Sequence, residues 1–425
     1  MARGEAFPYE FDEQDFENGL RLVTVPLPWR GVASVYLVVH AGSRNEVEPG
    51  RSGFAHFFEH MMFRGTRAFP PERYERALQR MGAASNAYTD DDRTVYHTTL
   101  ASEDLEALLE MEADRFQNLE YSEEDFRTEA LAVLGEYWKD SAEPLNRLFE
   151  VLRDTAFAAH PYKHTTMGFL RDIERMPEMY DYSVEFFDRY YRPENTTILV
   201  CGDVSPQAAR AMVERHWGGW RRGRGRPEVP EEPPQRGLRE ARIEWETHTL
   251  PYVAVAQKAP AYDDERAECA ALDLISALCF SPGSELYRRL VIERQWVEDL
   301  WANTVDHVDP YLFTVVARVK QAERTGDVRR AIEEELERIA AGPPEEERVD
   351  RVKSHLRYRF VLGLDRSEAV AAALAPYIGL RRTPATVNRL FDTIGGTGPD
   401  EVAQAAREWF GRETRTVVVL EEKAG

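Results

Sequence analysis

The sequence has few cysteines and a shortage of positive charge. Its 425 residues include 3 cysteines, an odd number without a Cys-x-x-Cys pair, so we expect neither a disulfide framework nor a thiolate metal site. Lys and Arg number 54 against 75 Asp and Glu, which gives a formal net charge of −21. Nucleic acids and anionic membranes bind basic surfaces, so this balance argues against both as partners.

Long apolar runs are also missing. No stretch approaches the roughly 18–20 apolar residues of a membrane-spanning helix, and the first residues lack the apolar segment of a signal peptide. The chain is long enough for two domains of about 200 residues, each able to bury its own core. We therefore expect a soluble, cytoplasmic protein, or a periplasmic one if a leader has been removed.

A cluster of metal-binding residue types lies between Gly53 and Gly65. His56, Glu59 and His60 form a His-x-x-Glu-His pattern within a run of good helix formers. Positions i, i+3 and i+4 share one face of a helix, with Cβ atoms about 5–6 Å apart. Two imidazoles so placed can bind one metal ion while the carboxylate handles a proton. The pattern should arise by chance on the order of 0.02 times in such a chain, so we interpret this helix as a metal site.

A catalytic zinc ion takes three protein ligands and leaves the fourth position to water, whose pKa falls to about 7. The third ligand must come from elsewhere in the chain, and Glu129 and Glu136 are candidates at the border of an apolar helical stripe. Two helical turns separate them by about 10 Å, so both cannot bind one metal. The residue types alone leave open which glutamate is the ligand, and two solvated surface glutamates are the plainer alternative.

The chain changes composition after about residue 220. The segment 221–240 is rich in proline and arginine, which indicates a linker between an N-terminal domain, 1–220, and a C-terminal domain, 241–425. Its Arg-Gly-Arg-Gly-Arg stretch could suggest RNA binding, but the stretch is short and the chain is acidic. Strands, helices and a closing strand follow in the same order in both halves. We infer a duplicated α+β fold, with a metal site in the first copy.

Periodicity predicts the positions of the main elements. Strands are expected at 20–25, 32–39, 83–100, 196–201, 241–247 and 252–258, between 294 and 319, and at 416–420. Helices are expected around the histidines and at 71–81, 102–139 with a break near 121–122, 205–217, 264–280, 284–293, 328–341, 346–362, 367–380 and 400–410, and a further helix is expected to end at 186–191 before Pro193.

The pattern around His56 and His60 is the inverted form of the commoner His-Glu-x-x-His. The sequence resembles the pitrilysin/insulinase family of inverzincin zinc peptidases, specifically its short two-domain members such as mitochondrial processing peptidase β and bacterial homologues. The resemblance is dense in the first half and loose in the second. It extends through Phe63-Arg64-Gly65-Thr66, Asn86-Ala87-Tyr88-Thr89, Glu129 with Glu136, His160-Pro161-Tyr162, Gly168, Tyr191-x-Pro193-x-Asn195 and Gly202-Asp203.

The resemblance implies a zinc endopeptidase with one Zn²⁺ per chain. In the family the third ligand lies about 75 residues beyond the second histidine, which selects Glu136 and leaves Glu129 as an outer-shell acid. Glu59 is then the residue that activates water.

The resemblance also implies how substrate binds and how the domains are built. The strand that holds Asn86 and Ala87 would bind an extended peptide as an added β-strand. Each domain would be a mainly antiparallel sheet flanked by helices, and the chain would form one half of a clam-like chamber.

The sequence departs from the family at one further position. Complete family sites use an arginine and a tyrosine, seven residues apart, from the second domain, but Val291 and Glu298 stand at the aligned positions. We expect a heterodimer in which a metal-less sister subunit supplies this pair, or otherwise a homodimer. The alternative function is a structural or peptide-binding subunit without turnover.

Overall fold

The computed structural model describes residues 5–303 and 306–423. The chain divides into two compact units. Unit 1 comprises Met1–Tyr137, His164–Pro230 and Phe360–Val387, and unit 2 comprises Trp138–Lys163, Glu231–Arg359 and Asn388–Gly425. This grouping differs from the contiguous domains expected from the sequence, because 138–163 belongs to unit 2 and 360–387 to unit 1. Residues 218–238 contain neither helix nor strand.

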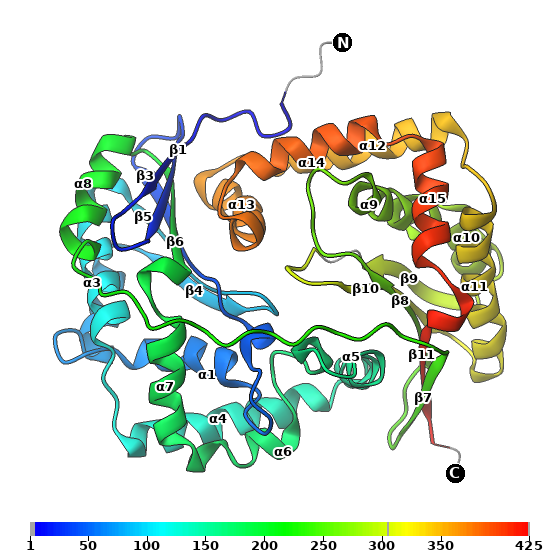
Figure 1. Cartoon of the computed structure of the whole chain (residues 1–425), viewed down its shortest axis with the longest axis horizontal. Helices are drawn as coiled ribbons and strands as arrows, with labels where there is room; N and C mark the ends of the chain where they lie inside the picture. Colours follow the sequence, from blue (N-terminus) through cyan, green and yellow to red (C-terminus); the bar gives the residue numbers. More distant parts are fainter. Residues whose placement is uncertain (1–4, 304–305, 424–425) are drawn as a thin grey trace. The chain divides into compact units, whose positions relative to one another are not determined.

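Unit 1 is built on a six-stranded, mainly antiparallel sheet (Figure 1). Its order is β1-β2-β6-β3-β5-β4, and of these neighbours β2 and β6 alone pair in parallel. The central strands β3 and β6 are almost wholly buried, as expected for strands covered on both faces, whereas β4 forms an edge. The strands are β1 (Asp12–Asp15), β2 (Arg21–Pro26), β3 (Val32–Val39), β4 (Ala84–Thr89), β5 (Thr94–Ala101) and β6 (Thr196–Gly202).

Helices cover both faces of this sheet. The helices of the first half are α1 (Phe54–Met61), α2 (Pro71–Arg80), α3 (Leu105–Asn118), α4 (Glu123–Ser141), α6 (Leu170–Ile173), α7 (Tyr180–Tyr190) and α8 (Pro206–Trp217). Helix α13 (Ser367–Arg381), from the second half, packs on β3 and β6. The Gly379 carbonyl of α13 lies 3.2 Å from His40 Nδ1. The Pro376 carbonyl accepts a hydrogen bond from Arg93 Nη1 at 2.5 Å.

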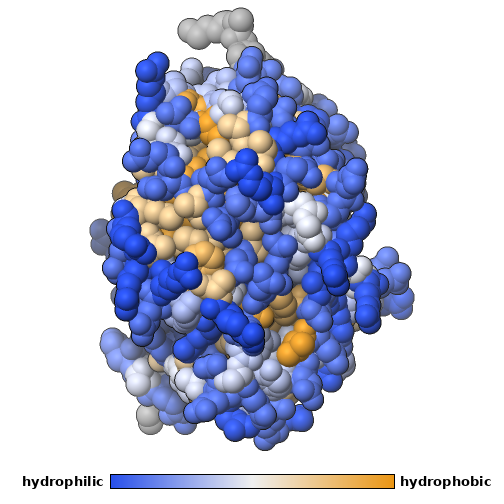
Figure 2. Space-filling view, turned by 90° about the vertical axis from the view of Figure 1, so that its left-hand side faces the viewer, coloured by the Kyte–Doolittle hydropathy of each residue, from blue (hydrophilic) through white to orange (hydrophobic). Residues whose placement is uncertain are grey.

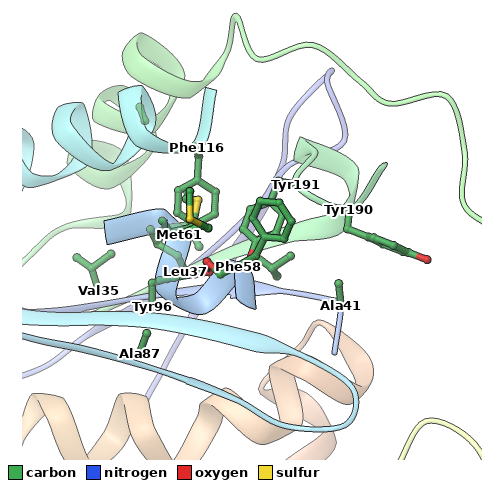
Figure 3. Close-up of a cluster of buried hydrophobic side chains, with 14 of the residues drawn as sticks. Val35, Leu37, Ala41, Phe58, Met61, Ala87, Tyr96, Phe116, Tyr190 and Tyr191 are labelled. Atoms are coloured by element: carbon green, nitrogen blue, oxygen red, sulfur yellow. Dashed lines mark hydrogen bonds between the residues drawn. The ribbon is translucent and has the colours of Figure 1, made fainter. Parts of the chain in front are cut away.

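The short helix α1 is buried on its apolar side. Phe58 and Met61 point into a core that contains Phe116 and Tyr191 (Figure 3), and the rings of Phe58 and Tyr191 are 5.6 Å apart. Tyr96 of β5 donates a hydrogen bond to the Phe58 carbonyl at 3.0 Å. Aromatic packing and this bond therefore fix the rotation of α1 about its axis, and so the direction in which its polar side faces.

Unit 2 repeats this plan with a five-stranded sheet. The order β7-β11-β8-β10-β9 matches β2-β6-β3-β5-β4, and again the first pair is parallel and the others antiparallel. The fold class predicted from the sequence is thus confirmed, and the common topology supports an internal duplication. The strands are β7 (Arg239–Trp245), β8 (Tyr252–Ala259), β9 (Val297–Asn303), β10 (Tyr311–Val319) and β11 (Thr416–Glu422).

The helices of unit 2 include one contributed by the first half. Helix α5 (Pro144–Ala156) packs Leu148 and Leu152 against Ala254, Val316 and Val418 of the sheet. It corresponds to α13 in unit 1, so each sheet is covered by a helix from the other half. The remaining helices are α9 (Ala267–Phe280), α10 (Glu285–Tyr287), the π-helix η7 (Arg288–Glu293), α11 (Thr325–Ala341), α12 (Glu346–Leu362), α14 (Ala385–Gly396) and α15 (Pro399–Trp409).

The surface agrees with the acidic, polar composition. The face drawn in Figure 2 is mostly hydrophilic, with apolar side chains in smaller patches among polar ones. Among the described helices, none is both long and apolar enough to span a membrane.

The N-terminus of α1 is held by a buried carboxylate. Glu46 accepts hydrogen bonds from the backbone N–H groups of Gly53 and Ala55, both at 2.7 Å. Burial raises the pKa of Glu46 to about 8, and these two bonds offset only part of that effect. Gly53 has φ of +92°, and a Cβ there would lie 2.3 Å from the Ile173 side chain, so the turn into α1 requires glycine. Gly168 packs against this turn, and its own Cβ would lie 2.8 Å from Gly53 N.

We expect Glu46→Ala to lower the free energy of unfolding by about 2–4 kcal/mol, because two buried N–H groups would lose their acceptor. Urea denaturation measures this loss. Glu75→Ala, on the exposed face of α2, is the matched control and should change stability by less than about 0.5 kcal/mol. Equal stabilities for the two variants would show that Glu46 does not hold the helix.

Candidate metal centre

Two histidines of α1 face a glutamate of α4. His56 and His60 lie one turn apart, with ring centroids separated by 4.8 Å. Glu136 Oε2 lies 3.7 Å from His56 Nε2 and 3.3 Å from His60 Nε2. Among the described residues, these three form a group whose potential ligand atoms all lie within 4.8 Å of one another. The structure thus brings together the three residues that the sequence and the family resemblance predict as ligands.

The donor set fits a zinc ion. Zinc prefers imidazole nitrogen and carboxylate oxygen at about 2.0–2.1 Å in a tetrahedral arrangement, in which neighbouring donors are about 3.3 Å apart. The separations of 3.7 and 3.3 Å between Glu136 Oε2 and the Nε2 atoms of His56 and His60 come close to that edge length. Three protein donors leave the fourth position for water or substrate, which is the arrangement of catalytic rather than structural zinc.

Glu129 lies on the far side of His60 from Glu136. Its Oε1 is 2.9 Å from His60 Nδ1, and its Oε2 accepts hydrogen bonds from the Arg64 guanidinium, one of them from Nε at 2.7 Å. Burial acts to raise the pKa of Glu129, but the bonds from His60 and Arg64 outweigh it and lower the pKa. An ionised Glu129 keeps the proton of His60 on Nδ1 and leaves Nε2 free to bind a metal.

The surroundings of His60 favour a positive charge. The hydrogen bond to Glu129 raises the pKa of His60 against the opposing effect of burial, and the charges of Glu136 and Glu59 add to this. Three carboxylates thus converge on one imidazole. The same field that stabilises a proton on the ring also stabilises a divalent cation at its Nε2.

Glu59 lies beside the proposed ligands without joining them. Its Oε2 accepts a hydrogen bond from Thr89 Oγ1 of β4 at 2.7 Å. Burial raises the pKa of Glu59, although the bond from Thr89 opposes the shift. A carboxylate with a raised pKa next to a metal-bound water is suited to exchange protons near neutral pH.

The predicted substrate strand lies next to this site. Asn86 and Ala87 belong to β4, where they pair with His97 and Tyr96 of β5. Ala87 is buried and Asn86 is exposed, so their side chains leave opposite faces of the strand. Because β4 is the last strand of the sheet, its outer backbone groups lie at an edge, and Thr89 ties that edge to Glu59.

Sequence reasoning did not assign roles to Arg64, Thr89 and Glu46. Arg64 follows His60 by four residues, so helical spacing could have suggested that both contact the same glutamate. Thr89 comes from strand β4 and lies in a stretch that resembles the family, but nothing in that stretch indicated a contact with Glu59. Glu46 lies in a loop without periodicity, so no pattern pointed to it. The substituted positions Val291 and Glu298 belong to unit 2, in η7 and β9, and Glu298 pairs with Arg318 at 2.9 Å.

Comparisons with known proteins find similar peptidases along most of the chain. Residues 22–169 match the family described as insulinase (peptidase family M16), and residues 180–356 match the peptidase M16 inactive domain. The chain is 29% identical to the zinc protease PqqE of Helicobacter pylori over 85% of this chain and 82% of that protein. It is 24% identical to the β subunit of the mitochondrial processing peptidase of Neurospora crassa over 89% and 81%. The crystal structure of a protease from Helicobacter pylori superposes with a TM-score of 0.90 at 27% identity and covers 97% of this chain and 99% of that one.

We expect Glu136→Gln and Glu129→Gln to affect zinc binding differently. Loss of a ligand should leave little zinc on the dialysed Glu136→Gln chain, whereas Glu129→Gln should bind zinc with an affinity about 10–100-fold lower, as is typical when the partner of a ligand is removed. Elemental analysis and titration against a chelating dye measure both. Glu124→Gln, on the exposed face of α4, is the control and should match the parent. Full zinc content in Glu136→Gln would refute the assignment.

Proposed function

The chain belongs to the insulinase, or M16, family of peptidases, and from this premise we propose that it is a zinc-dependent endopeptidase that cleaves peptides or unstructured polypeptides. One observation carries the proposal: His56, His60 and Glu136 converge within ligand distance, with Glu59 beside them. This is the residue set that hydrolysis of an amide by a metal-activated water requires.

Each side chain has a distinct task in this proposal. His56, His60 and Glu136 would hold Zn²⁺, one per chain, and Glu129 fixes the tautomer of His60. When bound, zinc lowers the pKa of a coordinated water to about 7 and polarises the substrate carbonyl. Glu59 takes a proton from the attacking water and passes it to the leaving amine nitrogen. Thr89 orients Glu59 through the 2.7 Å hydrogen bond and leaves its second oxygen for this exchange.

The substrate would bind as an extended strand along β4. Its backbone would pair with the edge that contains Asn86 and Ala87, as in other cases of β-strand addition. Such binding relies on main-chain groups, so it accepts many sequences provided that the segment is unfolded. The bond from Thr89 to Glu59 supports this proposal, because it places the water-activating group next to the edge where the peptide would lie.

Replacing Glu59 by Gln should separate binding from turnover. We expect Glu59→Gln to retain about one zinc per chain and to lose at least about 100-fold in kcat on a quenched fluorescent peptide, because the amide cannot accept the proton of water. Glu124→Gln is the matched control and should keep parental activity. If the parent cleaves no faster than Glu59→Gln even when each is combined with a metal-less sister subunit, the chain is not a peptidase.

That outcome would favour a second function, a peptide-binding or structural subunit without turnover. The match of residues 180–356 to the inactive domain of the family is the observation in its favour. An intact set of ligands and a placed acid favour the peptidase, because neither is needed to bind a peptide.

We further propose that a sister subunit completes the site, in a heterodimer whose halves enclose a clam-like chamber. Val291 and Glu298 offer no donor equivalent to the family's arginine and tyrosine, and Glu298 is already paired with Arg318. A homodimer would repeat this deficiency on both sides.

The purified chain alone should therefore be slow. We expect cleavage at least about 100-fold below that of the chain combined with a metal-less sister subunit, since a missing transition-state donor costs about 10²–10³ in kcat. Native mass spectrometry of the active species should give a heterodimer. Full activity of the isolated chain, as monomer or homodimer, would contradict this proposal.

A further inference from the structure

Unit 1 contains a basic pocket. This cavity, of about 570 Å³, lies where the residues after α8 pass the η1 turn (Ser43–Asn45), the end of α7 and the turn that precedes β6. The charged and polar residues that line it include Arg44, Arg189, Glu194, Asn195, Arg222 and Arg226. Four of these residues are arginines and one is a glutamate, which is the reverse of the charge balance of the chain as a whole.

Two of the four guanidinium groups have no carboxylate partner among the residues that the structure describes. Arg189 pairs with Glu48 at 2.6 Å, and Arg44 lies 3.9 Å from an Asp92 oxygen. Within the described residues, Arg222 and Arg226 have no ion pair, and Arg226 donates a hydrogen bond to the neutral side chain of Asn195. Arg222 and Arg226 are exposed, so each can turn its remaining N–H groups toward a ligand in the pocket.

The segment that carries these arginines is hydrogen-bonded to the residues before β6 at two points. The Gly223 N–H donates to Glu194 Oε1 at 2.8 Å, and Gly225 has φ of +106°, a conformation that other residues rarely adopt. The hydrogen bond from the Arg226 side chain to Asn195 Oδ1 attaches the C-terminal end of the stretch 222–226. Alternating glycine and arginine thus places Arg222 and Arg226 on the pocket, whereas Arg224 between them is not part of its lining.

Further positive charge lies behind the pocket. Arg382 donates to the backbone oxygens of Glu194, Thr196 and Gly19 rather than to a carboxylate. Burial lowers the pKa of Arg382, and the charge of Arg21 lowers it further, although Asp15 opposes this. Burial also lowers the pKa of the neighbouring His40 to about 3, and the charges of Arg382 and Arg226 add to the shift. The lining therefore holds more positive than negative charge, although ion pairs with Glu48 and Asp15 neutralise Arg189 and Arg21.

We propose that this pocket binds a small anion with two or more phosphate groups. Guanidinium groups bind phosphate oxygens through paired N–H donors, and several of them at fixed positions suit an extended anion better than a single phosphate. The volume accommodates such an anion, and the acidic remainder of the surface repels it elsewhere. The site is independent of the peptidase proposal, since none of its lining residues is a proposed zinc ligand or Glu59.

The test is calorimetric titration of the full, zinc-loaded chain with inorganic triphosphate at about 0.15 M salt, an ionic strength that screens weak surface binding. We expect one site per chain, and we expect Arg222→Gln with Arg226→Gln to weaken binding at least tenfold. Arg224→Gln is the matched control, because it removes the same charge from the same segment and should change the Kd by less than about threefold.

Two results would overturn the proposal. The first is an absence of binding by the parent, and the second is binding that the double substitution leaves unchanged, which would point to the zinc ion or to unspecific attraction. Inorganic pyrophosphate and a nucleoside triphosphate in parallel titrations distinguish a site for the phosphate chain from one that also contacts a base. An RNA oligonucleotide that binds more tightly than triphosphate, with the same arginine dependence, would replace the small anion by nucleic acid.

Discussion

The candidate site depends on how one short helix is fixed at its two ends by carboxylates. Helix α1 has two turns, too few to be stable alone, so its position is set by its contacts. Glu46 holds its first N–H groups, and Glu129 holds His60 near its last turn while it also binds Arg64 just beyond. Between these ends, the phenylalanines of α1 anchor its apolar side. The imidazoles are thus fixed before any metal arrives, which lowers the entropic cost of binding one.

The chemistry of the site follows from an unequal distribution of acids around His60. Glu129 is ionised and hydrogen-bonded to His60 Nδ1, whereas Glu136 faces the Nε2 atoms of both imidazoles. Glu59 is hydrogen-bonded to Thr89 instead. Three glutamates of the same chemical type therefore have three environments. Their different neighbours, rather than their identity, suit one to orient, one to bind metal and one to move a proton.

Most of the fold could be predicted from the sequence, because its long elements have clear periodicity. The central strands, α1 and most helices of the second half occur close to the expected positions. Strand β1 and the helices α5, α6 and α14 were not predicted. Strand β1 has the sequence DEQD and is largely exposed at an edge, so no apolar alternation marks it. Helix α6 has only four residues, too few for a period, whereas α5 and α14 do have apolar residues at helical spacing. The expected helix at 284–293 begins as α10 and continues as the π-helix η7, a change in hydrogen bonding that periodicity does not reveal.

The site could be predicted only as far as residues that lie on one helix. His56, Glu59 and His60 share a turn, so their spacing alone brings them together. The choice between Glu129 and Glu136 depended on the family resemblance, because it is fixed by how α4 crosses α1 and not by residue type. Thr89 and Glu46 come from a strand and a loop, and their contacts become visible only in three dimensions.

The exchange of α5 and α13 between the two sheets has a consequence for biosynthesis. The first sheet is complete once β6 has been made, but the helix that covers its second face ends at Arg381. At about 5–20 residues per second, a ribosome needs on the order of 10–40 s to synthesise the intervening chain. During that interval the face of the sheet that α13 covers lacks this helix, so its apolar side chains are exposed to water in the nascent chain. The second sheet is completed later still, because its strand β11 ends at Glu422.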